Sequence, residues 1–236
     1  MCSSDLAWGQ FIDHDLDLMT SDGATHIDIA IPAGDPMLHA STIPLTRTVI
    51  DPATGKDGKP GAVVNHITGW LDASMVYGSD AATAAALRSP DGRMLTSDGD
   101  NLPVVQGAFA AGDGRAGENP DLTSLQVLFV REHNTQVAKL RTQHPDWTAE
   151  QLYQQARAIV TAEIEHITYD EFVTHLLGQG ALRPYRGYDP QVDASISTEF
   201  AGAAFRFGHS IVSANLQKVG EQGQEDRKST RLNSSH

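Results

Sequence analysis

Apolar residues recur at helical spacing in three stretches of the chain. In residues 124–143, SLQVLFVREHNTQVAKLRTQ, they fall at positions 125, 128, 129, 137 and 140, which is one face of an amphipathic helix. A second helix is expected from residue 149 to Gly178, with Thr148 as its cap and Gln151 as the capping-box partner. Residues 197–212, STEFAGAAFRFGHSIV, have the same period and contain small residues that allow close packing. The pattern predicts a mainly helical fold.

Two long segments between the expected helices lack such a pattern. Residues 21–62 and 80–121 are rich in Gly, Pro, Asp and Thr and contain only short apolar runs. We expect irregular connections there, and connections of that length are commonly functional or insertional. The sequence shows no internal repeat, so it predicts one mainly α domain with long ordered loops.

The composition narrows the class of protein and of partner. Of the 236 residues 40% are hydrophobic and 20% charged, which is enough apolar material for one sizeable core. The formal net charge of −13 is spread along the chain and argues against binding to nucleic acid or to an anionic membrane surface. No apolar run approaches the roughly 20 residues of a membrane span. A small or neutral substrate fits this composition better.

Both ends of the sequence carry residues that we expect to be foreign to the natural protein. The tail DRKSTRLNSSH, residues 226–236, back-translates codon for codon to a common sequencing adapter, and the head, residues 1–6, fits its reverse complement. The expected natural stretch is residues 7–225, a partial domain truncated on its C-terminal side. The only cysteine, Cys2, lies in the head, so cysteine usage says nothing about the redox compartment.

The first candidate site is WGQFIDHDLDLMT, residues 8–20, which places charged residues among apolar ones at helical spacing. On a helix, Gln10, Asp13, His14 and Asp17 share one face, and Asp15 points away from that face. The pattern indicates polar groups aimed into a pocket, and the alternative is a solvated helix face. An HD pair also occurs in divalent-metal phosphohydrolases, but those enzymes need further histidines and a distant aspartate as ligands.

The second candidate site is TGWLDASMVYGSD, residues 68–80. Side-chain oxygens of Thr68, Asp72 and Ser74, with the backbone carbonyl of Trp70 between them, occur at every second position, as in loops that wrap a hard cation such as calcium. The charge is low for such a site, so a further carboxylate is needed, and Asp15 is the natural donor. The alternative is an Asp-capped turn that leads into a helix.

Three further motifs carry candidate chemistry. The loop GDGRAGENP, residues 112–120, contains Arg115 and Glu118, and arginine supplies a permanent cation with several donors, although surface loops often contain such residues. In FRFGHS, His209 lies in an otherwise apolar helix and is either a satisfied core residue or a ligand of a metal or haem iron. Glu163 and His166 form one ExxH pair, but a di-iron bundle needs two, so we interpret them as helix surface.

In this order and spacing, the motifs resemble the animal-type haem peroxidases of the peroxidase and cyclooxygenase superfamily. The resemblance is carried by WGQFIDHDLDL, TGWLDASMVYGSD, the loop with Arg115 and Glu118 before REHN, and FRFGH, and it covers residues 7–218. The segments IPAGDP and IPLTR look closer to bacterial members. The resemblance implies the animal-type haem peroxidase fold, a haem b cofactor, bound calcium, and oxidation of small organic donors or halides by hydrogen peroxide.

The resemblance also implies roles in catalysis. His14 looks like the distal histidine, which takes a proton from hydrogen peroxide and returns it to the departing oxygen. Arg115 looks like its partner, which stabilises negative charge as the O–O bond breaks. Gln10 matches the residue that orders water or halide in the distal pocket.

Further residues match the positions that hold cofactors in this family. His209 resembles the proximal ligand of the haem iron, and Arg206 the residue near a haem propionate. Asp13 and Glu118 match the carboxylates that form ester bonds to haem. The implied calcium site consists of Asp15, Thr68, the carbonyl of Trp70, Asp72 and Ser74.

Two departures from the family pattern affect the expected chemistry. Asn119 stands where some vertebrate members have a methionine that links to haem through a sulfonium bond, so that bond cannot form here. The sequence also stops soon after the proximal helix, before the asparagine that orients the proximal histidine. We therefore expect residues 7–225 alone to bind haem weakly.

The resemblance leaves two other functions open. One is a haem fatty-acid dioxygenase of the same superfamily, although no tyrosine adjoins His209 in the pattern of those enzymes. The other is a non-catalytic, calcium-stabilised binding or adhesion module, which the joint retention of His14, Arg115 and His209 disfavours. Calcium sites of this type fill readily outside the cell, so a secreted or cell-surface location is expected.

Overall fold

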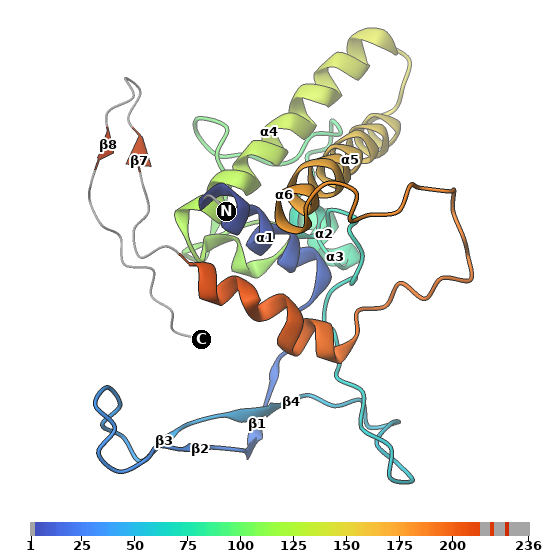
Figure 1. Ribbon diagram of the computed structural model, residues 1–236. Helices are drawn as coiled ribbons and strands as arrows, with labels where there is room; N and C mark the ends of the chain where they lie inside the picture. The colour runs from blue at the N-terminus through green and yellow to red at the C-terminus, as the bar shows by residue number, and fades with distance from the viewer. Residues whose placement is uncertain (1–2, 213–217, 220–224, 227–236) are drawn as a thin grey trace.

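The computed structural model describes residues 3–212, 218–219 and 225–226, and helices dominate it (Figure 1). Residues 1–2 and 227–236, which belong to the predicted foreign ends, lie outside the described residues. The elements are α1 (Ser3–Leu16), β1 (Ser21–His26), β2 (Ile29–Ala30), β3 (Thr42–Ile43), β4 (Thr46–Thr48), α2 (Ser74–Tyr77), α3 (Ala81–Ala86), β5 (Val104–Val105), β6 (Ala108–Phe109), η1 (Gly114–Gly117), α4 (Pro120–Gln143), α5 (Ala149–His166), η2 (Ile167–Phe172), α6 (Val173–Leu177), η3 (Phe200–Ala204), η4 (Phe205–Ile211), β7 (Lys218–Val219) and β8 (Glu225–Asp226).

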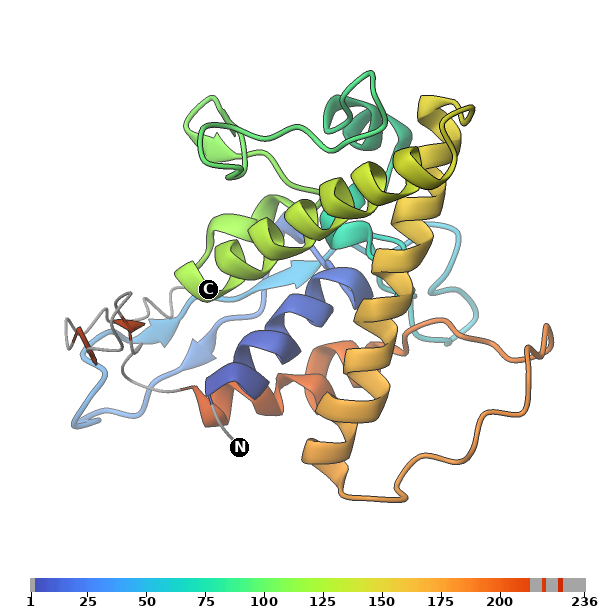
Figure 2. The same cartoon turned by 90° about the horizontal axis from the view of Figure 1, so that it is seen from above.

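The long helices α4 and α5 follow each other along the chain and pack together (Figure 2). Helix α4 begins four residues earlier than the apolar pattern indicates, because Asn119 caps it by accepting a hydrogen bond from Leu122 N at 3.0 Å. Thr148 caps α5 in the predicted capping box with Gln151. The helical run ends at Gly178 as predicted, but a π-helical turn, η2, lies between α5 and α6.

Helix α1 packs into the centre of the core. Phe11 is fully buried, and its ring stacks on that of Phe129 from α4 at a centroid distance of 5.4 Å. Trp8 packs against both rings and donates a hydrogen bond from Nε1 to Thr168 in η2 at 3.2 Å. Burial of these aromatic side chains fixes the rotation of α1 and therefore the direction of its polar residues.

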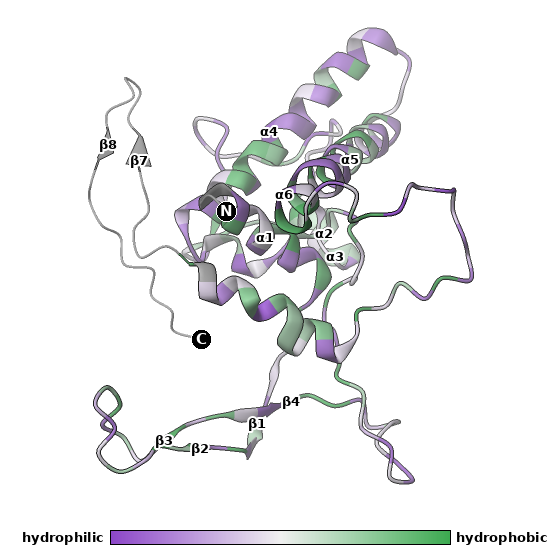
Figure 3. Ribbon diagram, viewed as in Figure 1, coloured by the Kyte–Doolittle hydropathy of each residue, from purple (hydrophilic) through white to green (hydrophobic). Residues whose placement is uncertain are grey.

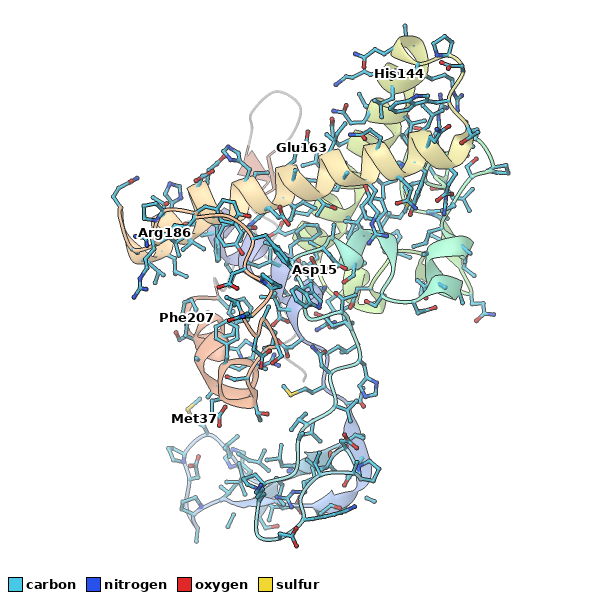
Figure 4. The ribbon with its side chains drawn as sticks, turned by 90° about the vertical axis from the view of Figure 1, so that its right-hand side faces the viewer. Asp15, Met37, His144, Glu163, Arg186 and Phe207 are labelled. Carbon is cyan, nitrogen blue, oxygen red and sulfur yellow. The ribbon has the colours of Figure 1, made fainter. Side chains whose placement is uncertain are left out.

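The segment 21–62 differs from the expected irregular connection. Strand β1 pairs with β4 and β2 pairs with β3, both antiparallel, in an arm that extends away from the helices (Figure 1). Met37, 83% exposed, lies on this arm far from Asp15 in the helical part (Figure 4), and Figure 3 shows apolar stretches along the arm. Interspersed Gly, Pro and Asp residues interrupt the alternation of apolar and polar residues that would predict these strands. The strands form because pairing across the arm gives their backbone N–H and C=O groups hydrogen-bond partners.

The segment 197–212 also differs from the expected regular helix. It forms a π-helical stretch, η3, followed by a 3₁₀ stretch, η4. The Nε of Arg206 donates a hydrogen bond to the carbonyl of Ala201 at 2.9 Å, so a side chain uses a carbonyl of the preceding turn. Figure 2 shows this segment beside α1, and the two elements are in contact.

Among the described residues, no helix combines the length and the apolar character required to cross a membrane.

Candidate functional site

Helix α1 presents functional groups on two sides, as its spacing predicts. His14 is 1% exposed, Asp17 is 2% exposed and Asp15 is fully buried, so the alternative of a solvated helix face is wrong. Asp15 contacts the start of α2, whereas Gln10, His14 and Asp17 contact the Arg115 loop or η4.

The carboxylate of Asp15 joins α1 to α2. Its oxygens accept hydrogen bonds from Ala73 N at 2.8 Å, Ser74 Oγ at 2.5 Å and Met75 N at 3.2 Å. Burial raises the pKa of Asp15 to about 6, and the nearby charge of Asp72 adds to this rise, although the three hydrogen bonds oppose it.

The predicted cation-binding side chains converge at this junction. Thr68 Oγ1 lies 3.0 Å from Asp72 Oδ1 and 3.1 Å from Ser74 Oγ, and Ser74 Oγ in turn bonds to Asp15. Ser74 N also donates to Asp72 Oδ1 at 3.1 Å, so the alternative of an Asp-stabilised turn holds at the same time. The Trp70 side chain is exposed, and only its backbone carbonyl was predicted to take part. No group of three or more His, Cys, Asp or Glu within the described ranges is arranged to hold a metal, so a cation here depends on hydroxyl and carbonyl oxygens as well.

The loop that carries Arg115 docks against α2 through a glycine. A Cβ atom on Gly112 would lie 2.3 Å from the carbonyl oxygen of Ser74, which only glycine avoids. The next residue, Asp113, donates its backbone N–H to Met75 O at 3.0 Å. This close approach brings η1 beside α1.

Asp113 holds the Arg115 side chain in place. Its two carboxylate oxygens accept hydrogen bonds from Nε and from Nη2 of Arg115, both at 2.9 Å, and the Nη1 of Arg115 lies 3.5 Å from Asp13 Oδ2. Burial would raise the pKa of Asp113, but the hydrogen bonds and the charge of Arg115 lower it below its usual value. Sequence reasoning missed Asp113, although its position two residues before Arg115 is a local signal for an aspartate turn.

His14 lies between two carboxyl groups of this loop, those of Asp113 and Glu118. Its Nδ1 is 3.9 Å from Asp113 Oδ1, and its Nε2 is 3.8 Å from Glu118 Oε2. The Nε2 of Gln10 donates to the same Glu118 oxygen at 3.1 Å, and Gln10 Oε1 accepts from Asn119 Nδ2 at 2.8 Å. The structure therefore brings Gln10, His14, Arg115 and Glu118 together.

Asp13 and Asp17 form a carboxyl pair on the remaining part of this face. Burial, with a hydrogen bond and charge repulsion from Asp17, raises the pKa of Asp13 to about 7, against the opposing charges of Arg206 and Arg115. Asp17 Oδ2 accepts a hydrogen bond from Arg206 Nη2 at 3.0 Å, and its Oδ1 is buried without a hydrogen bond from any described residue. Asp17, to which the sequence assigned no role, is thus the link from α1 to η4.

His209 lies on η4, three residues after Arg206, and its side chain is exposed. The alternative of a satisfied core histidine is therefore wrong. The ExxH residues lie at the surface as interpreted: His166 is exposed, and its Nδ1 lies 2.5 Å from Asp170 Oδ2.

Comparison with known proteins identifies the family. The family model described as animal haem peroxidase matches residues 5–236. The chain belongs to this family. It is 34% identical over 270 residues to eosinophil peroxidase of Mus musculus, covering 92% of this chain and 37% of that protein. It is 30% identical over 252 residues to peroxinectin A of Dictyostelium discoideum, covering 92% of this chain and 46% of that protein.

Solved structures of a peroxidase and of a fatty acid dioxygenase share the fold. Peroxidase A from Dictyostelium discoideum superposes with a TM-score of 0.81 at 30% identity, over 94% of this chain and 49% of that one. Fatty acid alpha-dioxygenase of Oryza sativa superposes with a TM-score of 0.62 at 28% identity, over 73% of this chain and 28% of that one. The chain thus spans less than half the length of these relatives, and the mainly helical haem peroxidase fold that the sequence predicts is confirmed.

The described residues fit the haem that the family name implies. An exposed imidazole, that of His209, lies on η4 with Arg206 three positions before it, and this element contacts α1. Next to this element are Asp13 on α1, with a raised pKa, and Asp17 directly after α1, with a buried oxygen that has no hydrogen bond from any described residue. A carboxyl group with a raised pKa and a buried oxygen without a hydrogen bond are both suited to a further polar partner at this place.

Proposed function

We propose that the protein to which this chain belongs is a haem-dependent peroxidase, which reduces hydrogen peroxide to water and oxidises small organic donors or halides. With one-electron donors, each peroxide consumes two electrons and two protons and yields two waters. The observation that carries the proposal is the buried His14, whose Nε2 lies 3.8 Å from the Glu118 oxygen to which Gln10 also donates, on a helix that contacts the Arg115 loop.

The residues of α1 and of the loop handle the proton and the charge of this reaction. His14 Nε2 takes a proton from one peroxide oxygen and returns it to the oxygen that leaves as water. Arg115, fixed by Asp113 and adjacent to Asp13, stabilises the negative charge that develops as the O–O bond breaks. Gln10 positions water or halide beside His14. Because these groups are held before substrate arrives, little reorganisation is needed in the reaction.

The cofactor would be held by residues of α1, of the Arg115 loop and of η4. Haem, when bound, supplies the iron that takes up the oxidising equivalents of peroxide. His209 would bind the haem iron, Arg206 would interact with a propionate, and Asp13 and Glu118 would be the carboxyl groups available for ester bonds to haem. The raised pKa of Asp13 near 7 keeps a fraction of this group neutral at physiological pH.

Calcium is the second proposed cofactor. Its ligands are Asp15, Thr68, the carbonyl of Trp70, Asp72 and Ser74. Two carboxylates and two hydroxyls that contact one another are suited to a hard cation, because its charge would favour the ionised form of Asp15, which burial and the nearby Asp72 disfavour. The cation would fix the start of α2 to α1 directly after His14. A secreted or cell-surface location, where calcium is abundant, follows from this site.

The test uses the haem-reconstituted full-length protein, assayed with hydrogen peroxide and a chromogenic phenol. His14→Ala is expected to reduce kcat/KM for peroxide by a factor of about 10³ or more, because proton transfer loses its carrier. His26→Ala, in the exposed arm, is the control and should retain turnover. Equal turnover of wild type and His14→Ala would contradict the assigned role of His14.

A fatty-acid dioxygenase is the second candidate, favoured by the structural similarity to the Oryza sativa enzyme. It is distinguished by oxygen uptake with a long-chain fatty acid in the same preparation. Oxygen uptake without peroxide-dependent phenol oxidation would favour the dioxygenase. Haem binding with neither activity would favour a non-catalytic binding or adhesion module.

A further inference from the structure

Asn119 makes two side-chain hydrogen bonds whose directions depend on each other. One runs to the backbone of α4: Asn119 Oδ1 accepts from Leu122 N at 3.0 Å. The other runs to α1: Asn119 Nδ2 donates to Gln10 Oε1 at 2.8 Å. Asn119 thus connects the N-terminus of α4 to the residue one helical turn before His14.

The backbone fixes the polarity of this connection. An amide side chain looks nearly symmetric, so its oxygen and nitrogen must be assigned from their partners. Leu122 N–H is a donor only, so the Asn119 atom that meets it must be the oxygen. The other atom of Asn119 is then the NH₂ group, and the Gln10 atom that meets it must be an acceptor.

The assignment continues through Gln10 to the pocket. With its oxygen turned to Asn119, Gln10 directs its NH₂ group toward Glu118 Oε2, at 3.1 Å. This carboxylate oxygen is also 3.8 Å from His14 Nε2. A carboxyl oxygen of the chain itself therefore lies between Gln10 and His14, at a place where a small anion could meet both side chains.

We infer that Asn119 is a positioning residue that fixes the amide of Gln10 with its nitrogen toward His14, so that the distal pocket offers an N–H donor to a small inorganic anion. The inference rests on the proposed function and concerns anion selectivity at the same site. A residue at position 119 that accepts instead of donating would turn Gln10 around and offer the anion a carbonyl oxygen.

Asn119→Asp inverts the polarity with little change in shape. The introduced carboxylate still caps α4, since aspartate and asparagine are equally good caps, but it accepts from Gln10 instead of donating. Asn119→Ser keeps a cap and removes the contact with Gln10 without adding charge. Ser124→Asp is the charge control, because it adds a carboxylate to an exposed position in the same end of α4.

The first measurement is a bromide titration of the haem-reconstituted full-length protein, followed by the change in its Soret absorption. We expect Asn119→Asp to weaken bromide binding about tenfold and Asn119→Ser by a smaller factor, as for the loss of one hydrogen bond to an anion. Ser124→Asp should stay within about twofold of wild type, since exposed charge is screened. In the Gln10→Ala background, Asn119→Asp should change bromide binding no more than Ser124→Asp does. Equal bromide dissociation constants in Asn119→Asp and Ser124→Asp would overturn the inference.

The second measurement does not depend on haem. In the haem-free chain labelled with ¹⁵N-glutamine, the NMR signal of the Gln10 side-chain amide is assigned by its loss in Gln10→Ala. We expect this signal to shift in Asn119→Asp and in Asn119→Ser but not in Ser124→Asp, and an unchanged signal would overturn the inference. If the protein lacks peroxidase turnover but the signal shifts, the proposed function fails and the role of Asn119 in orienting Gln10 stands.

Discussion

The two histidines of the site sit in very different surroundings. His14, on α1, is 1% exposed. Helix α1 bonds to η2 through Trp8 and to α2 through Asp15, and His14 itself lies close to Asp113 in the loop before η1. His209, on η4, is exposed, and the hydrogen bond between Arg206 and Asp17 links its element to α1. The difference indicates that the chain itself organises the surroundings of His14, whereas it leaves His209 accessible to a further partner, such as the proposed haem.

The largest loss of stability is expected for a substitution at Gly112, which lies in the loop next to His14. In Gly112→Ala the new Cβ would clash with backbone atoms of α2, so the loop with Asp113 and Arg115 must shift. We expect a loss of about 3 kcal/mol in the free energy of unfolding, measured by urea denaturation. Gly114→Ala, two residues along, is the matched control, because its Cβ would have no atom within 4 Å. Similar losses in the two variants would contradict the close docking of the loop.

The next largest loss of stability is expected for a substitution at Asp15, because its carboxylate joins α1 to α2. Asp15→Ala leaves the donors of Ala73, Ser74 and Met75 without their acceptor in a buried place. The expected loss is about 2 to 3 kcal/mol of unfolding free energy. Asp98→Ala removes an exposed carboxylate from a turn and should cost less than about 0.5 kcal/mol. Calcium, if it binds as proposed, should raise the melting temperature of wild type but not of Asp15→Ala.

A pH effect of intermediate size is expected from His133, which is buried in α4. Its ring bonds to Tyr77 Oη and to the Gly92 carbonyl, both at 3.0 Å, and burial lowers its pKa from 6.5 to about 4. As the pH falls below 6.5, His133 takes up a proton in the unfolded chain but not in the folded chain, so its contribution to stability declines until the pH reaches about 4. Asp13 and Asp15, with their raised pKa values, contribute in the opposite direction, so the effect of His133 is read as a difference between wild type and variant. We expect a loss of about 2 kcal/mol over this window.

His133→Gln should remove this contribution, since glutamine does not titrate, so the stability of wild type relative to the variant should fall by about 2 kcal/mol from pH 6.5 to pH 4. His26→Gln, in the exposed arm, should leave the wild-type pH profile unchanged. A difference in unfolding free energy between wild type and His133→Gln that stays constant between pH 6.5 and 4 would contradict the buried neutral state of His133.

Thr168 tests how far η2 helps to orient α1. Thr168→Val keeps the shape but removes the acceptor for Trp8 Nε1, and we expect a loss of about 1 kcal/mol. Thr142→Val in α4 is the matched control, because both threonines donate to the carbonyl four residues earlier but only Thr168 contacts Trp8. The comparison is made by thermal unfolding, and equal changes would mean that the bond to Trp8 contributes nothing.

The smallest effect on overall stability is expected for Arg206→Gln, because the Arg206 side chain is 38% exposed and its ion pair with Asp17 is partly screened. A loss of less than about 1 kcal/mol is expected. Hydrogen exchange should nevertheless separate the two sides: amides of η4 should exchange faster in the variant, while those of α1 keep their protection. Equal acceleration of exchange in η4 and α1 would show that the two elements unfold together, and would contradict the different surroundings inferred for His14 and His209.

Much of the fold was predictable because it depends on local signals. The apolar period gave α4 and α5, Thr148 and Gln151 gave the capping box, and Gly178 marked the end of the helical run. The arm was not predictable, since strand pairing joins residues that are distant in sequence, such as Ser21 and Thr48. The irregular form of η3 and η4 also escaped, because an amphipathic pattern does not distinguish an α-helix from a π or 3₁₀ one.

The candidate site, too, was predictable from the sequence only in part. Spacing alone placed Gln10, His14 and Asp17 on one face of a helix and Asp15 on the other. The partners of these residues were not readable from spacing, since Asp113 reaches His14 and Arg206 reaches Asp17 across long stretches of chain. The resemblance to the family named Arg115 and Glu118 but gave no reason to single out Asp113 or the bond from Asn119 to Gln10.

By itself, the sequence determined which polar residues lie on the same side of α1, because helical geometry is fixed by local backbone hydrogen bonds. The tertiary structure decided their ionisation and direction. Burial against Asp17 raises the pKa of Asp13 to about 7, and the backbone of α4 sets the polarity of Gln10 through Asn119. Desolvation and hydrogen-bond direction depend on which segments meet, and that is settled only when the chain folds.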